Sequence, residues 1–312
     1  MYPSYSALRH PGTNGLFIKP LPSPMESFPS IAKQYPPQTG IPEELAGLCD
    51  AGELLEKPLY AYMEKDLSPV PSRADREGEY DDRHLSWWCS GLLVFMSMWR
   101  QFLKYRSGVK GGEVYFELEC RSGRVLRHAF YQPETPLRVF GCDINIHHRE
   151  WMNAFLPSPI VTFQNTILPA LPLPDAGVDF FAAPTFFTHC DDFESAWLME
   201  IARVMKDDGL AFLSVRTDAF WNKIGADPVY SWMKSSFSDY YVKPYQLSAD
   251  AFSRPMPEPR LTLWPEEGYN PLVFYSREYI RENWSRFFDV LDIVEQAGGR
   301  DDLVVLRKRK LF

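Results

Sequence analysis

Short apolar stretches alternate with helical periodicities along the second half of the chain. From Gly111 onward the apolar stretches are EVYFEL, LRVFGCD, IVTFQN, GVDFFAAP and LAFLSVR, and amphipathic helical spacing fills the segments between several of them. Strands separated by helices are typical of parallel βαβ units with right-handed crossovers. The pattern therefore predicts an α/β fold with a mostly parallel sheet and helices on both faces.

The segment DFESAWLMEIARVMKDDG carries the clearest helix signals of the chain. Trp197 and Ile201 lie on one stripe at helical spacing. We expect Asp191 or Asp192 to cap the N-terminus of this helix and Gly209 to follow its C-terminus.

The end of the chain predicts one more helix followed by two strands. Ser276 is a suitable N-cap for a helix that carries Ile280 and Trp284, and FDVLDIVEQ and DLVVLRK are separated by the turn signal AGGRD. We expect these two strands to form an antiparallel hairpin. The basic residues RKRK that follow are interpreted as a solvated end rather than a targeting patch.

The first part of the chain differs from the second in composition. Twelve of the 27 prolines fall in residues 1–72, and proline removes a backbone donor, so we expect an extended or disordered arm over 1–40. Residues 41–110 are predicted to be a helical extension, with a charged break, SRADREGEYDDRH, before a tryptophan-rich helix at 84–105. The remaining domain is predicted to span 111–312.

Composition and charge narrow the class of protein. A chain of 312 residues that is 45% hydrophobic and 24% charged is long enough for a sizeable core. Its net charge of −8 argues against broad nucleic-acid or anionic-membrane surfaces. The most apolar run, LSWWCSGLLVFMSMW, is too short for a membrane span, so we expect a buried helix. Five scattered cysteines indicate a reducing, cytoplasmic location.

An ordered set of motifs resembles class I S-adenosylmethionine-dependent methyltransferases, in particular a small-molecule type with an FTH segment after the fourth strand. The set comprises LPLPD, VDF, FTH and EIARVMK, which stand in the family's order and spacing. The resemblance covers residues 111–215 and returns at 272–309. It implies a Rossmann-like, mostly parallel seven-stranded sheet with a C-terminal antiparallel hairpin, here preceded by the helical extension.

The resemblance also implies a cofactor site for S-adenosylmethionine. Asp143, at the end of the second strand, stands where the family binds both ribose hydroxyls, and Asn165 and Thr166 stand near the adenine position. The segment FELECRSGR stands where the family has a GxGxG turn, with Glu119 and Arg121 at the first two glycine positions. The residues assigned to cofactor binding are Glu117, Glu119, Arg121, Gly123, Asp143, Ile144, Asn165, Thr166 and Pro184.

Glu119 and Arg121 leave several arrangements open. Their side chains either turn away from the cofactor or fill its place, and a left-handed conformation costs each of them about 1–2 kcal/mol. The two could pair with each other across the turn and plug the methionine end of the site. Alternatively, Arg121 could bind a carboxylate, because its fork of donors suits that group.

His189, in FFTHCDD, is the candidate catalytic residue, because it follows the fourth strand and has acidic neighbours. The alternative is that His189 only supports the following helix. His147 and His148 point to different faces of their predicted helix, so we expect no metal site there. Cys120 and Cys190 are interpreted as buried apolar residues rather than nucleophiles.

Aromatic residues crowd the segment 219–275, which we predict to form a cap that binds the methyl acceptor. Such a cap suits an aromatic, glycosidic or hydrophobic small molecule, whereas the alternative is a core or a subunit interface in a homo-oligomer. The sequence favours methyl transfer from S-adenosylmethionine to a small molecule or glycan. The alternatives are a methyltransferase-like binding protein with a plugged site and an enzyme with a changed cofactor or reaction.

Overall fold

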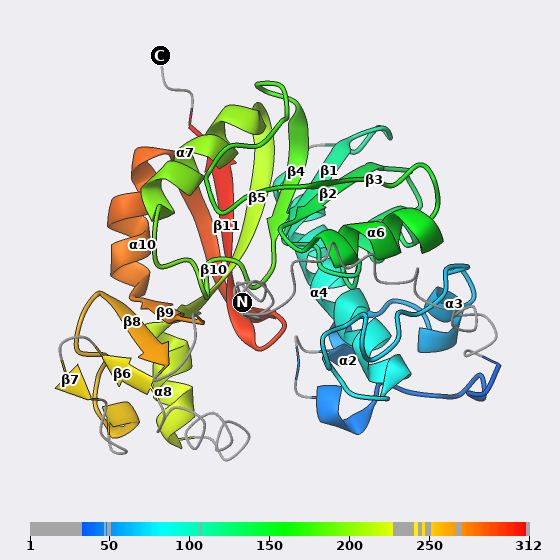
Figure 1. Cartoon of the computed structure of the whole chain (residues 1–312), viewed down its shortest axis with the longest axis horizontal. Helices are drawn as coiled ribbons and strands as arrows, with labels where there is room; N and C mark the ends of the chain where they lie inside the picture. The colour runs from blue at the N-terminus through cyan, green and yellow to red at the C-terminus, as the bar shows by residue number, and fades with distance from the viewer. Residues whose placement is uncertain are drawn as a thin grey trace, which may run out of the picture. The chain divides into compact units, whose positions relative to one another are not determined.

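The computed structural model of the protein resolves into two compact units, which are described separately (Figure 1). Of the described residues, the first unit contains those within Asn14–Ile167 and Gly177–Ala182, and the second contains those within Leu168–Ala176 and Ala183–Phe312. The predicted arm falls mostly outside the described residues, and the predicted domain boundaries at 40 and 110 stay predictions. The structure describes residues 33–46, 48, 51–106, 108–226, 240–242, 245–246, 251–265 and 270–309.

The first unit contains four strands in the order β3-β2-β1-β4, and its three strand pairings are all parallel. Tyr115 of β1 lies opposite Val139 of β2 on one side and Phe180 of β4 on the other. The strands and their connecting helices are β1 (Val114–Leu118), α5 (Leu126–Tyr131), β2 (Arg138–Asp143), α6 (Ile146–Phe155), β3 (Val161–Gln164) and β4 (Val178–Ala183).

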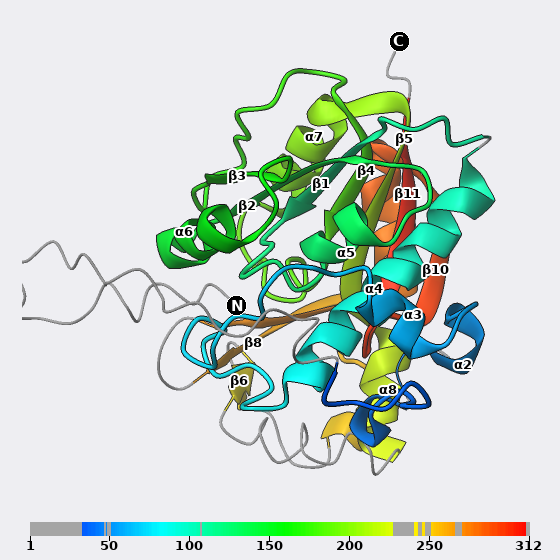
Figure 2. The same ribbon diagram turned by 90° about the vertical axis from the view of Figure 1, so that its right-hand side faces the viewer.

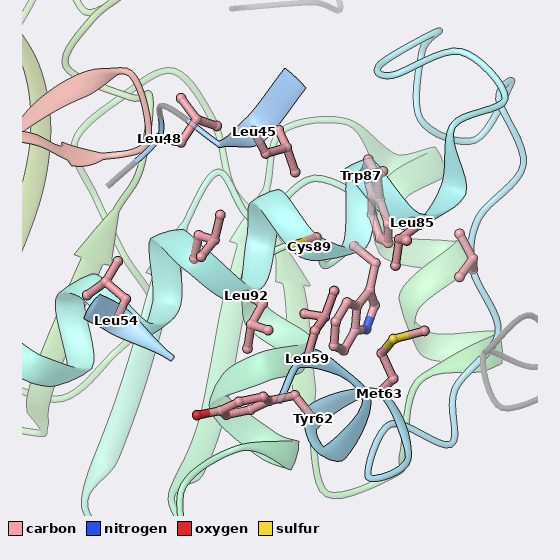
Figure 3. Packing of buried hydrophobic residues seen from close by; sticks show 13 residues of the cluster. Leu45, Leu48, Leu54, Leu59, Tyr62, Met63, Leu85, Trp87, Cys89 and Leu92 are labelled. Atoms are coloured by element: carbon pink, nitrogen blue, oxygen red, sulfur yellow. The ribbon is translucent and has the colours of Figure 1, made fainter. Parts of the chain in front are cut away.

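The helical extension is built around one long helix, α4 (His84–Tyr105), where the sequence predicts it. Rings of α4 stack on the sheet, with Phe102 4.7 Å from Phe180 between ring centroids. Side chains from the short helices α2 (Ala51–Leu54) and α3 (Leu59–Met63) converge with those of α4 in a buried cluster (Figure 3). A 3-10 turn, η2 (Glu43–Leu45), adds Leu45 to the same cluster.

A buried polar network ties the extension to α5. The carboxylate of Asp66 accepts hydrogen bonds from Arg127 Nε at 2.5 Å and Nη2 at 2.8 Å, and from Trp88 Nε1 at 2.7 Å. All three residues are fully buried. A buried charge is tolerated where its partners satisfy it in this way, so the extension is an integral part of the first unit.

The second unit is organised by the long strand β5, with the strand order β10-β11-β5-β9-β8-β6-β7. The strands β10 and β11 form the predicted antiparallel hairpin, and β11 is also antiparallel to β5 (Figure 2). The elements are α7 (Glu194–Val204), β5 (Met205–Thr217), α8 (Asp218–Ala226), β6 (Tyr240–Val242), β7 (Tyr245–Gln246), η5 (Ala251–Ser253), β8 (Arg260–Pro265), β9 (Leu272–Tyr275), α10 (Arg277–Asn283), η6 (Trp284–Arg286), β10 (Phe288–Gly298) and β11 (Asp301–Lys308).

The two units together contain the seven strands predicted for the central sheet, namely β1–β5, β10 and β11. The α/β class, the parallel strands, the terminal hairpin and the helical extension are confirmed. The predicted cap of α10 is also confirmed, since Ser276 Oγ accepts the Tyr279 N–H at 3.0 Å.

Both predicted ends of α7 are wrong. The N-cap is Phe193, with φ 61° and no capping side chain, rather than Asp191 or Asp192. The Asp191 carboxylate instead accepts the hydroxyl of Thr262 in β8. At the other end the helix stops at Val204, and Gly209 lies inside β5. Pairing with β11, as at Leu210↔Arg307, keeps this segment extended.

Four rings of the aromatic segment predicted as a cap contribute to a core. Phe220 and Trp221 of α8, together with Phe252 and Phe274, are buried in one cluster. The rings of Trp221 and Phe252 are 4.5 Å apart between centroids. The core interpretation therefore holds for these four rings. The cap stays a prediction, and four more of its aromatic residues, Tyr230, Trp232, Phe237 and Tyr269, lie outside the described residues.

Candidate cofactor site

The loop after β1 has the backbone of a glycine-rich turn although two of its residues are charged. Glu119, Arg121 and Gly123 have φ angles of 55°, 50° and 81°, which are all left-handed. Only glycine adopts this conformation without strain, and other residues lose about 1–2 kcal/mol. At Gly123 an added Cβ would meet Leu156 Cδ1 at 2.9 Å, so a larger residue would require Leu156 to shift in addition to the backbone strain. The loop thus keeps left-handed backbone at Glu119 and Arg121, although both residues disfavour this conformation.

Asp143 anchors this loop from the end of β2. Its Oδ2 accepts the Arg121 backbone N–H at 2.7 Å, and its Oδ1 accepts the Asn145 N–H at 2.8 Å. His148 Nδ1 lies 3.3 Å from Oδ1. A carboxylate offers about four acceptor positions. Asp143 therefore supports the turn and retains about one position for a further donor such as a ribose hydroxyl.

Two buried polar atoms beside Asp143 have no hydrogen-bond partner in the described part of the chain. Asn165 is 8% exposed, and its Nδ2 donates to the Thr166 carbonyl while its Oδ1 has no partner. His148 Nε2 is also without a hydrogen bond, and Glu77 Oε1 lies 3.9 Å from it. Buried polar atoms are rarely left unpaired unless a water or ligand completes them. Asn165 Oδ1 is suited to accept a ligand amine, such as the adenine amino group.

Charged residues from before α4 contact the loop and form a feature that the sequence interpretation missed. Residues 77–81, EGEYD, are called the acidic turn below. Arg121 Nη2 lies 3.1 Å from Glu77 Oε2, and Arg121 Nη1 lies 3.4 Å from Glu79 Oε1. Glu77 Oε1 also accepts Asn145 Nδ2 at 2.8 Å. The sequence analysis treated this segment only as a charged break between helices. Its acidic residues were the one signal that a basic residue such as Arg121 could pair with it.

Asp75, just before the acidic turn, is fixed to the same region. Its carbonyl accepts the Ser122 hydroxyl at 2.5 Å, and its carboxylate lies 2.8 Å from His147 Nε2. His147 and His148 thus contact different carboxylates, Asp75 and Asp143. In the described part of the chain, no three His, Cys, Asp or Glu residues are grouped so that they could hold a metal ion.

Two carboxyl groups at the end of β1 are shifted toward the protonated form. Burial raises the pKa of Glu117 to about 8, even though the Tyr115 hydroxyl donates to its carboxylate at 2.8 Å. Burial also raises the pKa of Glu119 to about 7, and the negative charge of Asp143 adds to this effect. At neutral pH Glu117 is therefore mostly a neutral acid, which limits the negative charge beneath the loop.

Eight of the nine expected cofactor residues lie in the first unit. Ile144 is one of them, and its carbonyl accepts a hydrogen bond from Gln164 Nε2 at 3.1 Å. Pro184 and His189 belong to the second unit. His189 Nδ1 lies 2.8 Å from the Pro271 carbonyl and must donate to it, because a carbonyl only accepts. The geometry of His189 thus agrees with a supporting role.

The cysteines that the structure describes are free and buried. Burial raises the pKa of the Cys120 thiol well above its usual range, so this thiol is a poor nucleophile. Cys190 Sγ lies 3.2 Å from the Asp192 carbonyl. Both residues behave as buried apolar groups. None of the described helices is long and apolar enough to cross a membrane.

Comparison with known proteins finds one family similar to part of the chain. Residues 116–213 match the family model described as a methyltransferase domain, which spans β1 to β5 and includes the loop and Asp143. The match agrees with the resemblance to methyltransferases over this segment. No curated protein matches the sequence.

Solved structures resemble the chain at low identity. An S-adenosylmethionine-dependent methyltransferase from Clostridium acetobutylicum has a TM-score of 0.47 and 10% identity, over 76% of this chain and 96% of that one. A chain from the complex of the Haloferax volcanii activator Trm112 with a methyltransferase has a TM-score of 0.46 and 14% identity, over 70% and 91%. The 1,6-didemethyltoxoflavin-N1-methyltransferase of Burkholderia thailandensis, solved with S-adenosylhomocysteine, has a TM-score of 0.44 and 13% identity, over 78% and 92%.

Proposed function

We propose that the protein transfers a methyl group from S-adenosylmethionine to a small-molecule or glycan acceptor. The observation that carries this proposal is the left-handed turn Glu119–Gly123 hydrogen-bonded to Asp143, beside the unpartnered Oδ1 of Asn165. These groups fit a cofactor that has ribose hydroxyls and an adenine amine. When bound, this cofactor supplies an electrophilic methyl group on a sulfonium.

The residues of the site act by binding and orientation. Asp143 accepts a ribose hydroxyl while it holds the loop, and Asn165 Oδ1 accepts the adenine amino group. Ile144 and Thr166 contribute to the same end of the site, and Pro184 continues the chain beyond β4. The raised pKa values of Glu117 and Glu119 reduce the negative charge of the loop where the methionine part binds. Positioning of this kind dominates methyl transfer, because the cofactor carries its own leaving group.

The acceptor end of the proposal rests on the aromatic segment 219–275 and on the family's small-molecule branch. We propose an aromatic or glycosidic small molecule as the acceptor and a cytoplasmic location for the protein. A homo-oligomer is an open alternative. The proposal assigns no nucleic acid, membrane or metal to the reaction. His189 remains a candidate for a role in catalysis, although its contact with Pro271 favours support of the loop.

A second candidate function is a binding protein of the same fold whose cofactor site is closed. The contact of the acidic turn with Arg121 favours it, because this turn lies on the loop that would bind the cofactor. In that case the helical extension and the aromatic segment would bind a partner.

Calorimetric titration with S-adenosylmethionine and S-adenosylhomocysteine separates the two functions. We expect micromolar binding that weakens about 100-fold in Asp143→Ala, since both a charged hydrogen bond and the loop anchor are lost. Asp207→Ala is the control, because Asp207 is an exposed acid of the second unit. Absence of binding in the native protein, with binding gained in the double variant Glu119→Gly, Arg121→Gly, would establish the closed-site alternative instead.

A further inference from the structure

Arg121 already pairs with carboxylates, one at each of its two terminal nitrogens. Its two terminal nitrogens lie 3.1 and 3.4 Å from the carboxylates of Glu77 and Glu79. Its backbone N–H donates to Asp143 at 2.7 Å, so the side chain starts beside the acid assigned to the ribose. The planar guanidinium fork matches a carboxylate better than any other side chain does.

The two acids that hold Arg121 belong to a strained and partly exposed segment. Four residues of the acidic turn have left-handed φ angles, and three of them, Glu77, Tyr80 and Asp81, are not glycine. The side chains of Glu77 and Glu79 are 27% and 23% exposed. Such strain persists only while neighbouring contacts hold it, and it is common in segments that change conformation.

The ends of the acidic turn are fixed independently of Arg121. Asp75 and Arg76 are 4% and 2% exposed, and the Arg76 guanidinium lies 5.7 Å from the ring centroid of Trp87 in α4. On the other side, His84 begins α4. Glu79 Oε1 also lies 3.5 Å from Arg124 Nε, so Glu79 keeps a cationic partner when it leaves Arg121.

We propose that Arg121 binds the carboxylate of the cofactor's methionine part, and that Glu77 and Glu79 occupy this guanidinium until the ligand displaces them. This inference rests on the proposed function and names a further specificity residue of the same site. One guanidinium cannot pair well with three carboxylates at once, and the incoming carboxylate is repelled by both acids. Ligand binding is therefore coupled to release of the acidic turn. In this proposal Arg121, which replaces a glycine of the family's pattern, binds the ligand instead of blocking its site.

Two ligands that differ in the carboxylate test this assignment. S-adenosylhomocysteine contains the amino-acid part, whereas 5′-methylthioadenosine has the same adenosine and a thioether but no amino-acid part. We expect Arg121→Gln to reduce the preference for S-adenosylhomocysteine over 5′-methylthioadenosine about tenfold, the effect of one charged hydrogen-bonded pair. The ratio of the two affinities cancels any general damage to the loop. Arg121→Lys keeps the charge without the fork, so its preference should lie between those of the native protein and Arg121→Gln.

The acids are tested by the double variant Glu77→Gln, Glu79→Gln, which should bind S-adenosylhomocysteine about five- to tenfold more tightly because the competing charges are removed. Asp82→Asn is the matched control, since it removes one charge just beyond the acidic turn, and Asp82 has no ion pair with the loop in the described structure. Unchanged affinity in the double variant would overturn the competition between acids and ligand.

The outcomes separate this inference from the proposed function. If the native protein binds both ligands and Arg121→Gln leaves their ratio unchanged, Arg121 does not bind the carboxylate, while the cofactor site stands. If Arg121→Gln tightens S-adenosylhomocysteine binding and keeps the ratio, Arg121 only latches the acidic turn and the inference is wrong. If neither the native protein nor the glutamine variants bind either ligand, the proposed function fails and this inference fails with it.

Discussion

The loops after β1 and after β4 are built from similar backbone conformations and serve different ends. Each contains non-glycine residues in the left-handed region, Glu119 and Arg121 in the first loop and Thr185 and Phe193 in or at the end of the second. Each follows a buried strand whose C-terminal end is a usual place for binding or catalytic groups. Their strain is therefore not what distinguishes them.

The partners of the two loops differ. The first loop is held by carboxylates that are partly exposed, and polar atoms without partners lie beside it, as at Asn165 Oδ1. In the second loop, His189 donates to the Pro271 carbonyl, and Arg260 donates to the Asp191 carbonyl at 2.7 Å and to Glu194 at 2.6 Å. The candidate binding loop is thus distinguished by ion pairs to partly exposed carboxylates and by a neighbouring polar atom without a partner. The structural loop is distinguished by hydrogen bonds to main-chain carbonyls and to a buried carboxylate.

The largest expected effect is at Arg260, which ties the second loop to α7 and β8. Arg260→Met should lower the free energy of unfolding by about 3–5 kcal/mol, because it leaves Glu194 buried without its cationic partner. Arg121→Met in the first loop should cost about 1 kcal/mol, since the carboxylates of its partners Glu77 and Glu79 remain partly exposed to solvent. Urea unfolding followed by tryptophan fluorescence measures both. Equal costs for the two substitutions would remove the distinction between the loops.

A smaller effect, with a definite dependence on pH, is expected at Glu117 beneath the first loop. Burial raises its pKa in the folded protein to about 8 from an ordinary value of 4.5, so the folded state holds a proton that the unfolded state releases. This contribution is complete below about pH 4.5 and is lost as the pH rises toward 8, for a decline of about 2–4 kcal/mol. Glu117→Gln should remove this decline.

Urea unfolding from pH 5 to pH 9 measures the Glu117 contribution. Glu295→Gln is the control: Glu295 belongs to the second unit, and hydrogen bonding to Lys223 lowers its pKa. Its profile should run parallel to that of the native protein. A Glu117→Gln profile that also runs parallel would show that Glu117 is not protonated in the folded state.

The smallest expected effect is at His189. His189→Ala should destabilise the second unit by about 1–2 kcal/mol through loss of the hydrogen bond to Pro271, and it should leave S-adenosylhomocysteine affinity unchanged. His189→Asn places an amide donor near the original Nδ1 and should recover part of this stability. If alanine costs no stability, the supporting role is wrong and the catalytic role gains weight.

Much of the fold could be predicted because its signals are local. The helix at 84–105, the cap at Ser276 and the terminal hairpin each depend on spacing or turn residues within a few positions. The ends of α7 could not be predicted in this way. Asp191 was expected to cap the helix, but its carboxylate is bound by Thr262, 71 residues later, and pairing with β11 overrides the helix-ending signal of Gly209.

The candidate site could be predicted only in part. Asp143 and the loop follow from the order of the motifs, and the structure brings eight of the nine expected cofactor residues into one unit. The partners of Arg121 could not be found, because Glu77 lies 44 residues earlier in a segment without helical or strand periodicity. No local pattern links two charges across that distance.

The sequence by itself determined the α/β class, the strand order along the chain and the position of the acid at the end of β2. These properties follow from hydrophobic periodicity and from turn and cap chemistry, which act over a few residues. Only the tertiary structure decided that Glu119 and Arg121 keep a left-handed turn and that the acidic turn holds Arg121. The physical reason is that strained backbone and exposed charge pairs are stabilised by neighbours that packing brings together from distant parts of the chain.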